Sequence, residues 1–201
     1  MSETPLTAWK TKRSMMKRYD ITAEIYDERY FEEQNRKYKK ALENVGVKGL
    51  SILDVGCGSG LFFSHVAEQA MLVVGVDVSH GLLLKAKERP ERNGNVFLVQ
   101  ADADHLPFRD NFFGATFAFT MLQNVPNPSE TITELKRVVE VNGKVVVTGL
   151  KKAFALNKFM DILEDSKMTL TAFVDEKTLN CYVAVLGSLS ISTSAASPLS
   201  A

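Results

Sequence analysis

The feature that most constrains this chain is an apolar run that ends in an acid and three glycines. Residues 53–60 read Leu-Asp-Val-Gly-Cys-Gly-Ser-Gly and follow Ser51 and Ile52. This pattern predicts a buried strand that stops at a tight turn, because glycine tolerates positive φ and lets another group approach the backbone closely. The apolar segment 61–70 predicts a helix whose first N–H groups face the same crevice. The sequence therefore predicts a small-molecule site at this turn.

The glycine spacing narrows the kind of ligand. Gly56-x-Gly58-x-Gly60 is one residue shorter than the G-x-G-x-x-G fingerprint of dinucleotide-binding folds. It is not a phosphate-binding loop either, because no Gly-Lys-Ser/Thr follows. The pattern alone is shared by several nucleotide-binding folds.

Apolar strand-like runs alternate with helical segments along the rest of the chain, and this order predicts a parallel sheet. The N-terminal stretch 9–45 predicts two or three short helices, and Ser129 is the expected N-cap of a later helix. We expect an α/β fold with a doubly wound, mostly parallel seven-stranded sheet, helices on both faces and an antiparallel C-terminal edge strand. The expected strands are 51–55, 71–77, 96–100, 115–120, 143–149, 168–174 and 181–186, and the expected helices between them are 60–70, 81–89, 129–139 and 154–165.

The composition indicates the broad class of protein. The 201 residues carry 24 Lys+Arg and 24 Asp+Glu, so no global basic field favours nucleic acid. Cys57 and Cys181 are the only cysteines and are expected to be free thiols in a reducing compartment. No apolar stretch approaches the roughly 18–20 residues of a membrane span, and residues 1–17 contain no signal-peptide core. We therefore expect a cytoplasmic protein, and no His/Cys cluster predicts a metal site.

Three acids, Asp54, Asp77 and Asp102, lie at or near the ends of three successive predicted strands. Ligands of open α/β sheets bind at that edge, where the strand order reverses. A carboxylate at the end of the second strand can accept both hydroxyl hydrogens of a ribose, which is the role expected for Asp77. Asp102 can accept a hydrogen bond from an exocyclic adenine amine. Together the acids indicate an adenosine without a pyrophosphate.

With these residues the chain resembles the class I S-adenosylmethionine-dependent methyltransferases. The match includes 53–60, Asp77, and Asp102 with Ala103, and it continues in 106–120, 134–138 and 142–144. The resemblance covers about residues 19–186 and is greatest to the type 11 group, which includes ubiquinone and menaquinone C-methyltransferases. It implies S-adenosyl-L-methionine as cofactor, an N-terminal helical lid (1–48) and the cofactor-binding domain (49–186). Residues 187–201 are rich in Ser and Ala and have no periodic apolar face, so we expect a disordered tail there.

The resemblance also implies a role for individual residues. The glycine turn would approach the methionine moiety, Asp54 would organise the turn and contact the amino group, and aromatic residues of the lid would close over the cofactor. Ribose, adenine and sulfonium contacts would come from the ends of the second, third and fourth strands. The implied cofactor-binding residues are Tyr19, Tyr26, Asp54, Gly56, Cys57, Gly58, Gly60, Asp77, Val78, Asp102, Ala103, Thr120 and Leu122.

Two departures from the family pattern bear on chemistry. Gly114 stands where the family usually has an acid, and residues 120–126 lack the Asn/Asp-Pro-Pro-aromatic motif of many amino-methylating enzymes. The second departure argues against N-methylation by that mechanism. The only candidates for a catalytic side chain are His105, Gln123 and Tyr26, and none forms a recognisable catalytic motif.

The sequence thus favours a methyltransferase that transfers a methyl group by in-line displacement to a small-molecule acceptor. Two alternatives stay open. The basic stretches 10–18 and 36–40 are compatible with a tRNA or protein substrate, bound alone or with a partner subunit. The second alternative is a protein that binds S-adenosylmethionine and has no transferase activity. The sequence does not indicate an oligomeric state.

Overall fold

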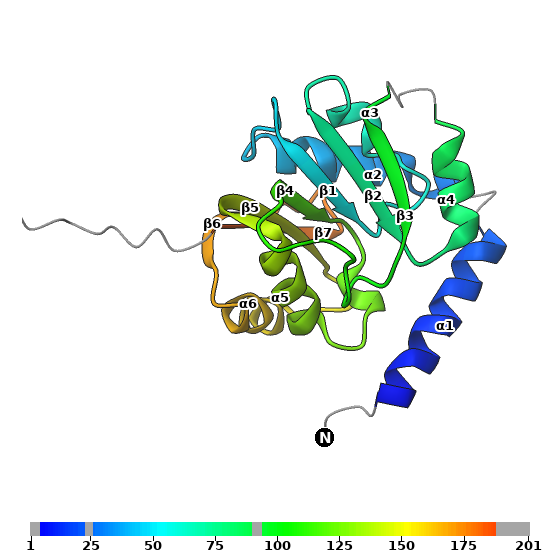
Figure 1. Ribbon diagram of the computed structural model, residues 1–201. Coiled ribbons are helices and arrows are strands. Elements are labelled where there is room, and N and C mark those ends of the chain that lie inside the picture. The colour runs from blue at the N-terminus through cyan, green and yellow to red at the C-terminus, as the bar shows by residue number, and fades with distance from the viewer. Residues whose placement is uncertain (1–4, 23–25, 90–93, 188–201) are drawn as a thin grey trace, which may run out of the picture.

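The computed structural model describes residues 5–22, 26–89 and 94–187 (Figure 1). Seven strands alternate with helices along this part of the chain. The strands are β1 (Ser51–Val55), β2 (Leu72–Asp77), β3 (Val96–Gln100), β4 (Phe113–Ala118), β5 (Val139–Leu150), β6 (Thr169–Val174) and β7 (Cys181–Gly187). The helices are α1 (Pro5–Thr22), α2 (Tyr26–Leu42), α3 (Phe63–Val66), α4 (His80–Lys87), the 3₁₀ turn η2 (Leu122–Asn124), α5 (Pro128–Val138) and α6 (Leu156–Asp165).

The strands form one sheet in the order β3-β2-β1-β4-β5-β7-β6. The first five in this order pair in parallel, and β7 pairs antiparallel with both β5 and β6. The predicted fold class is confirmed, with one difference at the C-terminal end. The antiparallel strand β7 lies inside the sheet and β6 forms the edge. Burial gives the physical reason, because every residue of β7 is buried whereas every residue of β6 is exposed or half-buried.

Helices cover both faces of the sheet. One apolar core joins α2, α3 and α4 to the sheet and includes the aromatic group Tyr38, Phe62, Phe117 and Phe119, whose ring centroids lie 4.7–5.8 Å apart. The other core joins α5 and α6 to the opposite face. In Figure 1, α5 and α6 lie together, whereas α1 runs separately and contacts α4 at one end. Among the helices of the described residues, none has the length and apolarity to cross a membrane.

Several helix and strand boundaries differ from the predicted ones. The N-terminal stretch forms two helices, whereas the helix predicted at 60–70 shrinks to α3 with turns around it. Leu61, Phe62 and Phe63 are all buried, and three consecutive residues cannot all lie on the buried face of a surface helix. The strand predicted at 115–120 ends at Ala118, and the strand predicted at 143–149 begins earlier, at Val139.

The start of α5 and the C-terminal tail also differ from prediction. Pro128 is the first residue of α5 and Asn127 is its N-cap, so the prediction of Ser129 as the cap is wrong. Proline is favoured at a first helical position because the missing N–H would be unpaired there anyway. Gly187, predicted to open the tail, is the last residue of β7. The rest of the predicted tail, 188–201, lies outside the described residues.

Candidate functional site

A cavity of about 730 Å³, including its open mouth, lies at the carboxyl ends of the first four strands. This is where the strand order reverses between β1 and β4, the usual ligand position in an open α/β sheet. The wall is formed by Lys12, Met15, Tyr19, Val55, Gly56, Gly58, Val76, Asp77, Val78, Leu82, Ala101, Asp102, Ala103, Phe119, Thr120, Met121, Asn124 and Val125.

The glycine turn forms one side of this wall. Gly56, Gly58 and Gly60 all have positive φ (72°, 57° and 77°), which explains why glycine occupies each position. Gly56 and Gly58 face the cavity, whereas Gly60 and Cys57 are not among the residues that line it. A Cβ on Gly60 would lie 2.5 Å from the Phe63 ring, so this glycine is required for packing.

Asp77 links the turn to the cavity. Its two carboxylate oxygens accept hydrogen bonds from the backbone N–H of Gly58 (2.9 Å) and of Ser79 (2.8 Å). The residue is only 9% exposed, and burial raises the pKa of its carboxyl despite these hydrogen bonds. Because a carboxylate offers about four lone-pair sites, Asp77 retains acceptor capacity for hydroxyl groups inside the cavity.

Asp54 lies behind the wall and does not line the cavity. It is 2% exposed, and burial together with the nearby charge of Asp77 raises the pKa of its carboxyl to about 8. At neutral pH Asp54 is therefore mostly protonated. Its predicted contact with a cofactor amino group stays a prediction.

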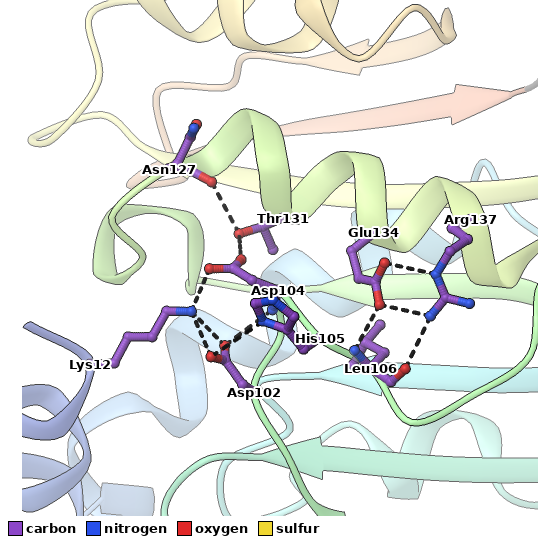
Figure 2. A network of polar contacts seen from close by, with 9 residues as sticks. All are labelled: Lys12, Asp102, Asp104, His105, Leu106, Asn127, Thr131, Glu134 and Arg137. Atoms are coloured by element: carbon purple, nitrogen blue, oxygen red, sulfur yellow. Dashed lines mark hydrogen bonds and ion pairs between the residues drawn. The ribbon is translucent and has the colours of Figure 1, made fainter. Parts of the chain in front are cut away.

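Helix α1 closes the β3 side of the cavity through Lys12 (Figure 2). The Lys12 ammonium lies 2.6 Å from Asp102 Oδ2 and 2.5 Å from Asp104 Oδ2. Burial opposes the charge, but the hydrogen bonds to both carboxylates raise the pKa of Lys12 overall. The Thr131 hydroxyl donates to Asp104 from the other side. Asp102 and Ala103 thus line the cavity, and Asp102 already has a partner in α1. Their contact with the adenine stays a prediction.

The end of α1 docks on two further points of the rim. Asn124 donates to the Tyr19 hydroxyl (2.9 Å), and burial raises the pKa of that phenol. Asp20 accepts hydrogen bonds from the Ser79 hydroxyl (2.6 Å) and from Gly81 N–H (3.0 Å). The predicted lid residue Tyr19 therefore lines the cavity. The side chain of the other, Tyr26, lies outside the described part of the chain.

Two of the three catalytic candidates, His105 and Gln123, are not in the cavity wall, and the side chain of the third, Tyr26, lies outside the described residues. The His105 side chain is 84% exposed and lies 3.9 Å from Asp102. Gln123 donates to the Thr120 carbonyl oxygen and does not line the cavity. Leu122, predicted near the sulfonium, is fully buried in the core beside the cavity. Thr120 lines the cavity as predicted.

A second network holds the loop after β3, which carries Asp102 (Figure 2). Glu134 and Arg137 of α5 form a two-point ion pair, with N···O distances of 2.7 and 2.8 Å. Both also bind the loop backbone: Glu134 accepts from Leu106 N–H (2.7 Å), and Arg137 donates to the carbonyls of Leu106 (3.0 Å) and Phe108 (2.8 Å). The Arg137 guanidinium lowers the pKa of Glu134, so this anchor is charged at neutral pH.

Sequence reasoning missed much of the wall, including Lys12, Met15 and Met121. Lys12 belongs to the basic stretch 10–18, which a pattern analysis assigns to solvent. The described residues contain no group of three or more His, Cys, Asp or Glu that could hold a metal ion.

The strand order and the cavity at the β1/β4 switch define the class I methyltransferase fold. More particularly, residues 53–147 match the family model of the type 11 methyltransferase domain.

Among curated proteins, the chain is similar to the demethylmenaquinone methyltransferase of Staphylococcus aureus (strain MRSA252), with 34% identity over 138 residues. These residues are 67% of this chain and 56% of the relative, so the chain spans little more than half the length of the curated relatives it matches.

Two solved structures share the fold. One is a SAM dependent methyltransferase from Aquifex aeolicus, with a TM-score of 0.66 and 20% identity over 74% of this chain and 88% of the other. The second is the [4+2]-cyclase SpnF, with a TM-score of 0.64 and 24% identity over 72% of this chain and 60% of the other. Since these identities are low and the second protein is named as a cyclase, the likeness shows the fold and not the reaction.

Proposed function

We propose that this protein is an S-adenosyl-L-methionine-dependent methyltransferase that acts on a small-molecule acceptor. The observation that carries the proposal is Asp77, a buried carboxylate in the cavity wall that also holds the glycine turn through Gly58 N–H. A ribose diol needs such an acceptor beside an open backbone turn. The matching family model and the name of the curated relative support the same activity.

The wall residues fit the cofactor from one end to the other. Gly56 and Gly58 have no side chain and line the cavity, so the methionine moiety would approach their backbone closely. A Cβ at Gly56 would also crowd Met121, whose side chain would lie 3.1 Å from it. Asp77 with Val78 would bind the ribose, and Asp102 with Ala103 would frame the adenine. Thr120 would stand at the methyl end, beside β4. When bound, S-adenosyl-L-methionine supplies a methyl group on a sulfonium whose sulfur leaves as a neutral thioether.

The contribution of this chain would be alignment and exclusion of water. Holding two reactants in line supplies much of the acceleration of a displacement with a good leaving group. Helix α1 covers the cavity with Lys12, Met15 and Tyr19, and it is held by polar contacts to three parts of the rim. The name of the curated relative, a demethylmenaquinone methyltransferase, favours a small acceptor over a macromolecule. We also propose a cytoplasmic location, which the reduced buried cysteines Cys57 and Cys181 support.

The test is cofactor binding by calorimetry with Asp77→Ala and Asp77→Asn. Two charge-assisted hydrogen bonds contribute about 1.5–3 kcal/mol each, so Asp77→Ala should lower the affinity for S-adenosylmethionine at least about 100-fold. Asp77→Asn keeps the shape of the side chain and checks that the turn still folds. The matched control is Asp161→Ala, because Asp161 is exposed on α6, which contributes nothing to the wall. Unchanged affinity in a folded Asp77→Ala protein would overturn the site assignment.

Labelled-methyl transfer into fractionated cell extract then tests the reaction. Label in small molecules is the expected result. Label in RNA or protein would replace the proposal with a macromolecular substrate, bound alone or with a partner subunit. Tight cofactor binding without label in any fraction would favour a binding protein without transferase activity.

A further inference from the structure

A polar cluster lies behind the cavity on the β4 side and has no role in the proposed cofactor contacts. Lys37 of α2 is 1% exposed, and Gln34 on the same helix is 3% exposed. A surface helix normally turns apolar residues toward the core. Burying a lysine there is costly unless its ammonium is paired. This cluster is therefore a candidate for a functional role.

The Lys37 ammonium is directed at the cavity wall. Its Nζ donates to the Thr120 hydroxyl oxygen at 2.7 Å. Glu33 Oε1 lies 3.6 Å away and Cys181 Sγ 3.8 Å away, so the hydroxyl is the nearest of these three partners. The Thr120 hydroxyl in turn donates to Gln34 Oε1 over a long distance of 3.3 Å. Lys37 thus stands behind Thr120, and Thr120 stands in the wall.

The backbone N–H and carbonyl groups of Thr120 form hydrogen bonds, as its hydroxyl does. Its N–H donates to the Thr148 hydroxyl (2.7 Å), and its carbonyl oxygen accepts from the side-chain amides of Gln123 and Asn124. Its φ is +55°, which is unfavourable for a β-branched residue. Backbone strain of this kind persists only where the surroundings enforce it, and it is concentrated at functional sites.

The two sides of the cavity carry different polar groups. The β2 and β3 side carries Asp77 and also Asp102, which is paired with the Lys12 ammonium. The β4 side carries Thr120 with the Lys37 ammonium behind it, next to the apolar Phe119, Met121 and Val125. An ammonium that donates to a hydroxyl makes that hydroxyl a stronger hydrogen-bond donor. This side therefore suits an apolar ring that carries a negatively charged oxygen.

We propose that Thr120 and Lys37 form a subsite for an acceptor bound as an oxyanion, a phenol, naphthol or enol that has released its proton to water. The Thr120 hydroxyl turns from Gln34 and donates to the oxyanion, and Lys37 acts through it as a positioning residue. The subsite rests on the proposed function, since it describes the acceptor of that reaction. It disfavours amines, because a protonated amine would meet a like charge behind Thr120.

The test uses a chromophoric phenol, 4-nitro-1-naphthol, whose neutral and ionised forms absorb at different wavelengths. Its spectrum is recorded at a pH below its own pKa, free and with the full-length protein, before and after cofactor addition. With the wild-type protein, the ratio of ionised to neutral probe should be at least tenfold higher than for the free probe. Lys37→Met and Thr120→Val should each remove this increase, and Thr120→Ser should restore it. Lys40→Met is the matched control, because Lys40 lies one turn further on α2 and pairs with Glu43 and Glu176.

A merely structural role of Lys37 predicts a different outcome. Lys37→Met would then change the melting temperature while the bound probe stayed ionised, and this result would overturn the proposal. A wild type that leaves the probe free, or that binds it as the neutral phenol, would overturn it as well. Calorimetry with S-adenosylmethionine distinguishes failure of the subsite from failure of the proposed function. If the cofactor binds but the probe is not ionised, only the oxyanion subsite is refuted. If the cofactor does not bind, the proposed function is refuted.

Discussion

Replacing Asp54 with asparagine should change how the stability of the protein depends on pH. The pKa of Asp54 is about 8 in the folded protein and about 3.8 in an ordinary carboxyl. Between these values the folded state holds a proton that the unfolded state has released. The free energy of unfolding therefore falls as pH rises through this window, by about 1.4 kcal/mol per pH unit for one proton.

Asparagine resembles the protonated carboxyl but cannot lose the proton, so the Asp54→Asn protein lacks this contribution. Over the interval from pH 5.5 to pH 7.0, the wild type should lose about 2 kcal/mol more stability than the variant. Urea unfolding at both pH values measures the difference. Asp77 and Cys57, whose pKa values are also raised by burial, are present in both proteins and largely cancel. Equal slopes for the two proteins would refute a protonated Asp54 in the fold.

Two further predictions concern packing and the attachment of α1. Gly60→Ala should destabilise the protein by about 2–4 kcal/mol, since its Cβ would clash with Phe63 and its φ is +77°; urea unfolding measures this. Gly94→Ala is the control, because Gly94 also has positive φ but no neighbour within 4 Å, so an equal loss in both variants would refute the packing argument. Lys12→Met should speed amide hydrogen exchange in α1 and leave β1 and β4 unchanged, because it removes both ion pairs to the loop after β3. The exposed Lys10→Met is its control, and unaltered exchange in α1 would show that these ion pairs do not hold the helix.

The fold and one side of the cavity could be predicted because their signals are local. The alternating segments give the sheet, and Gly56, Gly58 and Asp77 lie at or within three residues of a strand end. The reason for glycine at position 60 could not be predicted from local sequence. Gly60 belongs to the same motif, yet its neighbours Phe63 and Ala86 explain its presence, and only the packed structure shows them.

The other side of the cavity depends on contacts between distant parts of the chain. Lys12 pairs with Asp102, 90 positions away, and Lys37 with Thr120, 83 positions away. In the sequence both lysines lie among other charges and are indistinguishable from solvated ones. Burial decides their roles, and burial is a property of the docked helices. The position of β7 inside the sheet also depends on contacts between distant segments. Its continuous apolar sequence was nevertheless a usable signal of a fully buried strand.

The position of β7 has a consequence for how the chain folds. Strands β5 and β6 precede β7 in the sequence but are separated by it in the sheet. The β6 edge therefore cannot join the sheet until residues 181–187 have been synthesised and inserted. Pairing that waits for a late segment is slow and leaves a strand edge exposed. During synthesis the nascent protein would carry an unpaired β5 border, a period in which a chaperone or a second nascent chain could bind there.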